Sequence, residues 1–151
     1  MRKSGSAVRT LVGLTSALWM LAAPAVAQNI ADVKLVEAKQ LAGSVFRALE
    51  QCVQGKGAGA SCTLAEVASR AAVNPATGAT PDGRWIVGPG STLTLSSGAP
   101  PVVTGAIAIA GATGRDTAAL ALSLYVTPTG NAFRCETRSG VPPGPTGGQS
   151  C

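Results

Sequence analysis

The sequence predicts an α+β fold in which a long N-terminal amphipathic helix packs on a four- to five-stranded antiparallel sheet, followed by a C-terminal disulfide loop. Three observations support this prediction. Apolar residues recur at helical spacing between Asn29 and Cys52, short alternating runs separated by Gly and Pro follow Gly83, and four cysteines occur in a chain without histidine. The 151 residues suffice for one globular domain. We expect it to span residues 28–151 and to be preceded by an N-terminal segment, residues 1–27.

Residues 1–27 have the pattern of an export signal. Basic residues begin the segment, an apolar stretch runs from Leu11 to Ala23, and Pro24-Ala25-Val26-Ala27 ends in the small-x-small pattern that signal peptidase recognises. Cleavage after Ala27 is therefore expected. The alternative is a retained membrane helix, for which the apolar run is marginal because a bilayer needs about 20 residues. Contact with a membrane is expected only if the segment is retained.

The composition argues against an enzyme. Without histidine, the chain lacks the usual imidazole acid or base and the Ser-His and Cys-His nucleophile pairs. Its seven acidic residues are too scattered to suggest a metal cage. We therefore expect no catalytic residues, no cofactor, no metal and no small-molecule substrate.

DNA is not an expected partner either. Residues 1–27 hold three of the twelve basic residues and none of the seven acidic ones, so the rest of the chain has a net charge of +2. A nucleic-acid surface would need clustered cations, and at this net charge ordinary solvated charges and a core Trp are favoured. The residues considered for such a surface are Arg84, Arg115, Arg134 and Arg138, with Trp85 to stack on a base. Proteins are therefore the expected partners.

The first predicted helix spans Asn29 to about Cys52. Asn29 is expected to cap its start, with Asp32 near the positive end of the helix, and the glycines between Gly55 and Gly59 are expected to end it. The expected buried stripe consists of apolar residues three, four or eight positions apart, namely Ile30, Val33, Leu41, Val45, Leu49 and Cys52.

A short second helix is predicted directly after Cys62. Thr63-Leu64-Ala65-Glu66 is a capping-box sequence, and apolar residues at helical spacing extend the prediction to about Val73. Asn74-Pro75 cannot continue a helix, so residues 74–83 are expected to form a loop.

Five runs beyond Gly83 are predicted to form an antiparallel meander with one buried face. The runs are short, most of them alternate apolar and polar residues, and turn-forming residues separate them. They span residues 84–87, 91–97, 102–110, 119–127 and 132–137. The apolar stripe of the helix and the apolar face of the sheet are expected to cover each other. Gly140 to Ser150 is too rich in Gly and Pro for a further strand.

Export favours disulfides over metal binding for the four cysteines, because the outer compartments are oxidising. Three connectivities are open. We expect the local pairs Cys52–Cys62 and Cys135–Cys151, since each would close a Gly-rich or Pro-rich segment whose chain entropy opposes folding. Closing the second loop stabilises the fold by about 3 kcal/mol in the chain-entropy treatment.

The C-terminal disulfide loop is the candidate recognition surface. Loops held by a rigid scaffold commonly carry binding, and the candidate partner contacts are Arg134, Arg138, Pro142 and Pro143. The competing interpretation is a stapled tail that only protects the last strand.

The order of these elements resembles a type IV pilin or pseudopilin. The stretch from Leu21-Ala22-Ala23-Pro24 through Val36-Glu37-Ala38-Lys39 resembles the passage from a pilin's apolar N-terminal helix into its amphipathic half. Phe133-Arg134-Cys135 to Ser150-Cys151 resembles the family's C-terminal disulfide region. The peptidase site of the family differs here, because Ser6 follows Gly5 and Thr10 stands where the family has Glu.

The resemblance implies a non-enzymatic exported structural or adhesion protein, similar to a minor pilin processed after Gly5, with other pilus subunits as partners. The alternative is a soluble periplasmic or secreted binding or inhibitor module, released by cleavage after Ala27. The first interpretation places the protein in a pilus or at the cell surface, and the second places it in the periplasm or the medium.

Overall fold

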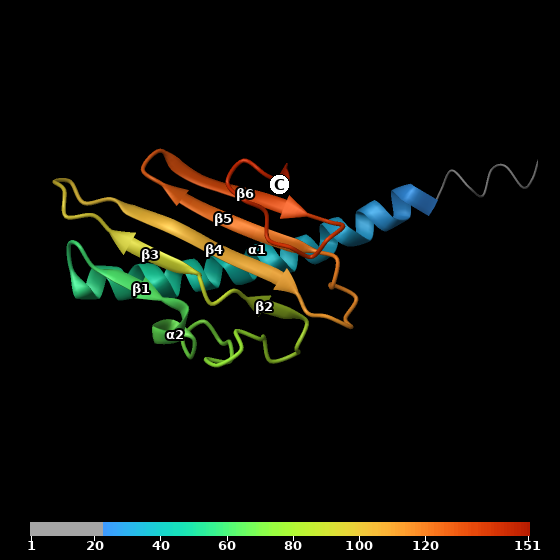
Figure 1. The fold of residues 1–151 in the computed structure, drawn as a ribbon, viewed down its shortest axis with the longest axis horizontal. Coiled ribbons are helices and arrows are strands. Elements are labelled where there is room, and N and C mark those ends of the chain that lie inside the picture. The colour runs from blue at the N-terminus through green and yellow to red at the C-terminus, as the bar shows by residue number, and fades with distance from the viewer. Residues whose placement is uncertain (1–22) are drawn as a thin grey trace, which may run out of the picture. The chain divides into compact units, whose positions relative to one another are not determined.

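Helix α1 (Ala23–Lys56) and an antiparallel sheet dominate the described chain (Figure 1). The computed structural model describes the backbone of residues 23–151 and the side chains from Ile30 onward. The predicted basic start, the apolar stretch up to residue 22 and the Gly5 site lie outside these residues. The chain divides between Val33 and Lys34 into two compact units, and the second unit contains the sheet and the rest of α1.

Helix α1 is longer than predicted, with 34 residues. Residues 23–28 are already helical, so Asn29 lies inside the helix and the predicted N-cap is wrong. The helix continues beyond the predicted end near Cys52 and includes Gly55, and it ends at the next glycine, because Gly57 follows Lys56 with a left-handed φ of 94°. Within the described residues, no helix combines the length and hydropathy needed to cross a membrane.

The buried stripe of α1 differs from the predicted one. Val45 and Leu49 are buried as expected, whereas Ile30 and Val33 are 50% and 66% exposed. Three alanines occupy places in the stripe that a search for large apolar residues overlooks. The buried residues of α1 are Leu35, Ala38, Ala42, Val45, Ala48, Leu49 and Val53.

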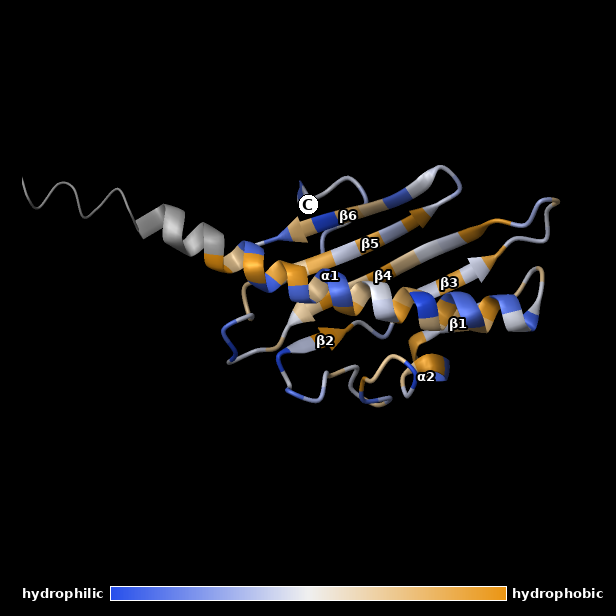
Figure 2. Ribbon diagram, turned by 180° about the vertical axis from the view of Figure 1, so that it is seen from behind, coloured by the Kyte–Doolittle hydropathy of each residue, from blue (hydrophilic) through white to orange (hydrophobic). Residues whose placement is uncertain are grey.

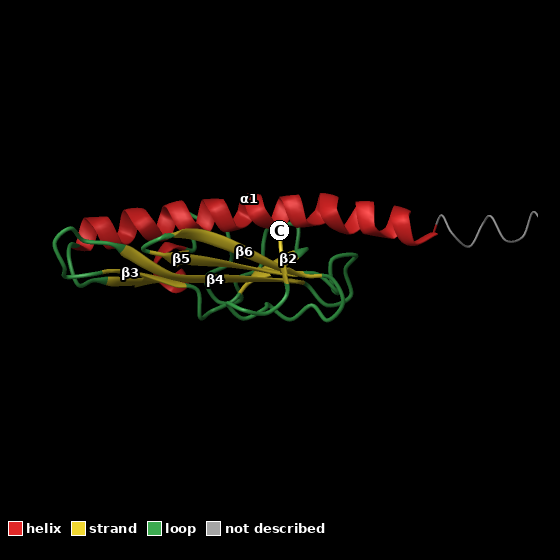
Figure 3. Ribbon diagram, turned by 90° about the horizontal axis from the view of Figure 1, so that it is seen from above, coloured by secondary structure: helices red, strands yellow, loops and turns green. Residues whose placement is uncertain are grey.

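From Lys34 onward, α1 lies across one face of the sheet (Figure 3). Figure 2 looks onto α1 from the side away from the sheet and shows hydrophilic residues interleaved with hydrophobic ones along the helix. The sheet contributes buried aliphatic side chains to the core, among them Val87, Leu93, Ile107, Ile109, Leu122 and Leu124. The predicted α+β class is therefore confirmed.

Among residues 23–151 the sheet has seven strands, where four or five were expected. They are β1 (Ser61–Thr63), β2 (Trp85–Val87), β3 (Thr92–Leu95), β4 (Val103–Gly111), β5 (Ala121–Thr127), β6 (Gly130–Glu136) and β7 (Gln149–Ser150). All pairs are antiparallel in the order β1-β3-β4-β5-β6-β7, and β2 shares one edge of β4 with β3. Strands β3 to β6 form the expected meander.

Strands β1 and β7 are the two that the sequence pattern does not predict. Strand β1 is three residues long, too short to show alternation, and it pairs with β3. The expectation that no strand lies between Gly140 and Ser150 is wrong, because Gln149 and Ser150 follow the Gly- and Pro-rich part and pair with β6.

Helix α2 (Leu64–Val67) is shorter than predicted, since the expected end was near Val73. Its capping box is confirmed, because the Glu66 Oε2 accepts a hydrogen bond from the backbone N–H of Thr63 at 2.8 Å. Turns follow the helix as far as Ala72, whose φ of 55° is left-handed and incompatible with continued helix.

Candidate functional site

The Cys135–Cys151 disulfide ties Cys151 to β6. Its Cα atoms lie 5.8 Å apart, and it confirms the expected pairing. Cys135 is buried, and the backbone of Gln149 pairs with it across the β6–β7 ladder. Lys39 of α1 donates a hydrogen bond to the Cys151 carbonyl oxygen at 2.6 Å. These bonds fix both ends of the segment between β6 and β7, residues 137–148, called here the C-terminal loop.

Three contacts hold the middle of the C-terminal loop against the sheet. The N–H of Gly140 donates to the Ala119 carbonyl at 2.9 Å, and the Tyr125 hydroxyl donates to the Pro143 carbonyl at 2.8 Å. The Pro143 ring packs on Gly148, where an added Cβ would stand 2.8 Å from the Pro143 Cβ. Both glycines have a φ of 66°, which glycine adopts without strain. The path of this loop, drawn in red near the C-terminus in Figure 1, is therefore fixed by contacts.

The four predicted contact residues differ in accessibility. Arg138 is exposed, and Pro142 and Pro143 are half-buried. Arg134 is also half-buried, and its Nε is buried without a hydrogen-bond partner among the described residues. Val141 is 64% exposed, although the sequence did not single it out. A valine between Gly140 and Pro142 belongs to no periodic pattern, so hydropathy gives no signal for it.

A polar hollow of about 170 Å³ lies beside the C-terminal loop. Its lining comes from the end of β6, the following turn and the start of β7: Cys135, Glu136, Thr137, Arg138, Gly148 and Gln149. The Glu136 carboxylate accepts the backbone N–H groups of Thr137 and Arg138, each at 2.8 Å. Glu136 thereby shapes the turn that presents Arg138 at the hollow.

Two of the residues considered for a DNA surface, Arg84 and Trp85, make contacts within the protein instead. Arg84 donates to the Glu37 carboxylate of α1 at 2.9 Å and to the Asp116 carboxylate at 3.1 Å. Trp85 is only 3% exposed, and its Nε1 donates to Glu37 at 3.3 Å. The interpretation of Trp85 as a core residue is confirmed, so its ring is not accessible for stacking on a base.

Charges around Arg84 link α1 to the β4–β5 connection. Lys34 donates to Asp116 through both the side-chain carboxylate, at 3.1 Å, and the backbone carbonyl, at 2.8 Å. Hydrogen bonds from Lys34 and then from Arg84 hold the pKa of the Asp116 carboxyl below its usual value. Hydrogen bonds to Asp116 and Glu37 raise the pKa of Arg84. The cluster is a structural clamp between helix and sheet.

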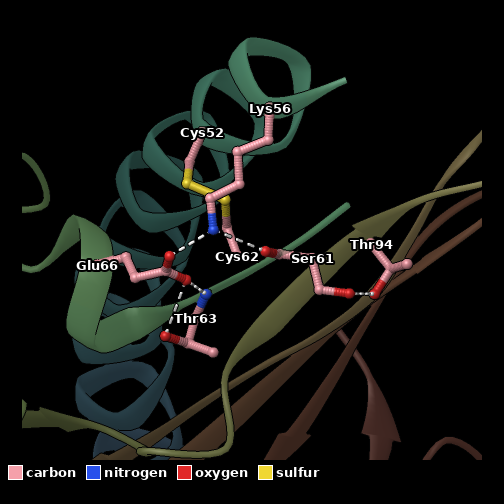
Figure 4. Close-up of a disulfide and its surroundings, with 7 residues drawn as sticks. All are labelled: Cys52, Lys56, Ser61, Cys62, Thr63, Glu66 and Thr94. Atoms are coloured by element: carbon pink, nitrogen blue, oxygen red, sulfur yellow. Dashed lines mark hydrogen bonds and ion pairs between the residues drawn. A yellow bond between two sulfur atoms is a disulfide. The ribbon is translucent and has the colours of Figure 1, made fainter. Parts of the chain in front are cut away.

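The Cys52–Cys62 disulfide joins α1 to β1 and confirms the second expected pairing (Figure 4). Lys56, one turn after Cys52, forms an ion pair with Glu66 of α2. The two sulfurs and the Glu66 carboxylate lie within 4.8 Å of one another. Because the sulfurs are bonded to each other, neither provides the thiolate that zinc binds. Hydrogen bonding from Lys56 instead lowers the pKa of Glu66.

The C-terminal loop combines proline rings, an exposed valine and an exposed arginine, a set suited to binding a protein surface. Comparisons of the chain with protein-family models, curated proteins and solved structures find no match.

Proposed function

We propose that this chain is a non-enzymatic, exported structural protein that acts as a minor subunit similar to a type IV pilin or pseudopilin. The observation that carries the proposal is the order of parts: a helix unbroken from Ala23 to Lys56, then an antiparallel sheet, then a disulfide from β6 to Cys151. Such a subunit uses the start of its helix for contacts with other subunits and the sheet as a folded head.

Two features of the described chain support an exported subunit. Its two disulfides indicate an oxidising environment, as in exported proteins. Ile30 and Val33 expose apolar side chains on the early part of α1, and exposed apolar residues that share a helix face mark contact surfaces. Residues three positions apart lie on the same side of a helix, so both side chains are available to one neighbouring helix.

N-terminal sequencing of the protein from its native cell tests this proposal. The proposal requires a mature chain beginning at Ser6 in the sheared surface or membrane fraction, in place of the Gln28 start that the export-signal pattern of residues 1–27 predicts. A chain beginning at Gln28 in the soluble fraction would overturn the subunit role.

Variants of α1 provide a second test in the native cell. Replacing Ile30 and Val33 by Ser should remove the protein from the sheared fraction while leaving the head folded, because neither side chain is buried. Arg47→Ser, an exposed change further along α1, is the matched control and should leave fractionation unchanged. Equal fractionation of both variants would show that these apolar side chains make no subunit contact.

A soluble binding or inhibitor module is the second candidate function. The observation in its favour is the C-terminal loop, which exposes Val141 on a path fixed by hydrogen bonds and a disulfide. A mature start at Gln28 would make this the leading interpretation.

A further inference from the structure

We propose that residues 34–42 of helix α1, called here the latch, open away from the sheet at a hinge formed by Gly43 and Ser44, while the part of α1 after the hinge stays attached. This conformational switch goes beyond the proposed subunit role, because its residues all follow Gln28 and therefore belong to either expected mature chain. Its test does not depend on where the mature chain begins.

The hinge is a weak point inside a continuous helix. Glycine is a poor helix former, because its backbone loses more freedom on folding than that of any other residue. Packing does not require glycine here, since a Cβ added at Gly43 would have no neighbouring atom within 4 Å. The Ser44 Oγ donates to the Leu41 carbonyl at 2.8 Å, a bond that competes with the helical ladder, and Gly and Ser pairs are sites at which helices bend. The sequence thus places flexibility where the core does not demand it.

The part of α1 after the hinge, residues 45–56, is anchored to the core. The Cys52–Cys62 disulfide bonds it to β1. Its fully buried aliphatic side chains are Val45, Leu49 and Val53. This anchored part cannot leave the sheet without unfolding the core, because these side chains would all be exposed to water.

The latch buries less apolar surface than the anchored part. Ala38 and Ala42 are fully buried, but each contributes only one methyl group, and Leu35 adds one larger side chain. Exposing these groups to water costs less than exposing two valines and a leucine, because the cost follows the apolar area. The latch therefore depends more on polar contacts than the anchored part does.

Charged side chains of the latch make these polar contacts. Glu37 accepts hydrogen bonds from Arg84 and from the Nε1 of Trp85. Lys34 donates to Asp116. The Asp116 and Glu37 side chains are 55% and 43% exposed, so water can take the place of their partners when the latch opens. Contacts of this kind hold the latch closed and are lost at small cost.

Opening changes the surface of the molecule. Trp85 is 3% exposed in the closed form, and its contact with Glu37 is lost when the latch leaves the sheet. The indole ring and the apolar side of the latch then become accessible, and the helix before Gly43 is free to change direction relative to the sheet. The latch therefore couples the course of α1 to the exposure of an apolar surface.

Native-state hydrogen exchange of the full chain, resolved by residue, tests the latch. After correction for intrinsic rates, amides of residues 38–42 should exchange at least about tenfold faster than those of residues 49–53, because a local opening releases them. Equal exchange in the two ranges would overturn the proposal, since α1 would then open only together with the whole domain.

Gly43→Ala tests the hinge. The substitution should slow exchange in the latch about fivefold, because alanine favours the helical form that the open state gives up. Gly55→Ala is the matched control, at a glycine of the same helix where an added Cβ also has no neighbour within 4 Å. It should leave exchange in the latch unchanged, because Gly55 stays helical in the open form. An equal effect of the two substitutions on the latch would show that Gly43 is no hinge.

Arg84→Gln tests the polar contacts. It should speed exchange in the latch about fivefold in a chain that circular dichroism shows to be folded. Arg115→Gln, at an exposed arginine of the β4–β5 connection, is the matched control and should have no effect. Raising the salt concentration should speed exchange in the wild-type latch more than in Arg84→Gln, because screening weakens the ion pairs that the variant lacks. A latch that responds alike to both arginine substitutions would contradict the proposal.

Discussion

Two loops of the chain are each closed by a disulfide, but the surroundings of the two bonds differ. The Cys52–Cys62 bond spans 10 positions and lies between α1 and β1, where Cys62 is fully buried. The Cys135–Cys151 bond spans 16 positions and closes a loop whose chain is largely exposed. Chain entropy gives about 3 kcal/mol for either closure. What distinguishes the two loops is therefore the packing around each bond.

Packing around the first bond connects three elements. Buried Val53 follows Cys52 directly, buried Leu64 and Val67 lie in α2 shortly after Cys62, and the Lys56–Glu66 ion pair joins α1 to α2. The second loop instead is held by individual hydrogen bonds and leaves Val141 exposed. The comparison shows that the first disulfide secures the core, whereas the second holds a surface in place.

The largest effect is expected from removing the first disulfide. Cys52→Ala with Cys62→Ala should lower the free energy of unfolding by about 3–5 kcal/mol, because lost loop closure also frees α1 from β1, the two elements that this bond joins. Urea unfolding measures this loss. A loss no larger than that of the second double variant would contradict the difference drawn between the loops.

Removing the second disulfide should cost less and act locally. Cys135→Ala with Cys151→Ala should lower the free energy of unfolding by about 2–3 kcal/mol. Hydrogen exchange should rise in residues 137–150 and stay slow in β4 and β5, because the central ladders do not depend on this bond. Faster exchange throughout the sheet would place the second bond in the core and remove the distinction.

The pairing of the four cysteines could be predicted from the sequence. Each pair flanks a Gly- or Pro-rich segment, and closing such a segment favours local pairing. The capping box at Thr63 is equally predictable, since its residues interact within one turn. The buried stripe of α1 could not be predicted in the same way. Ala38 and Ala42 carry little hydropathy signal, and they are buried only through tertiary packing.

The role of the C-terminal loop as a recognition surface stays a prediction, and its conformation depends on contacts that the sequence does not show. Arg138, Pro142 and Pro143 were identified, yet the exposure of Val141 depends on where the loop crosses the sheet. That crossing is set by the Tyr125 hydroxyl bonding to Pro143, 18 positions away. Likewise, the Arg84 clamp joins residues 47 and 32 positions apart. Contacts between such distant positions leave no local pattern in a single sequence.

The Tyr125 hydrogen bond offers a finer test of the second loop. Tyr125→Phe should lower the free energy of unfolding by about 1 kcal/mol, the usual contribution of one hydrogen bond. The same substitution in the Cys135→Ala, Cys151→Ala background should have almost no effect, because the open loop no longer holds the Pro143 carbonyl in place. An undiminished effect in that background would show that Tyr125 does not act through the loop.

The smallest effect is expected at Glu66, beside the first disulfide. Because Lys56 and Thr63 lower the pKa of Glu66 in the folded chain, its ionised form stabilises the fold above pH 4.5, the usual value. This contribution is lost as the pH falls through the lowered pKa. In unfolding measurements between pH 7 and pH 2.5, Glu66→Gln should be less stable than wild type at pH 7 and converge with it in acid. Because Glu66 is exposed, the gap should be smaller than that of any variant above, and a gap that widens in acid would contradict the assigned pKa direction.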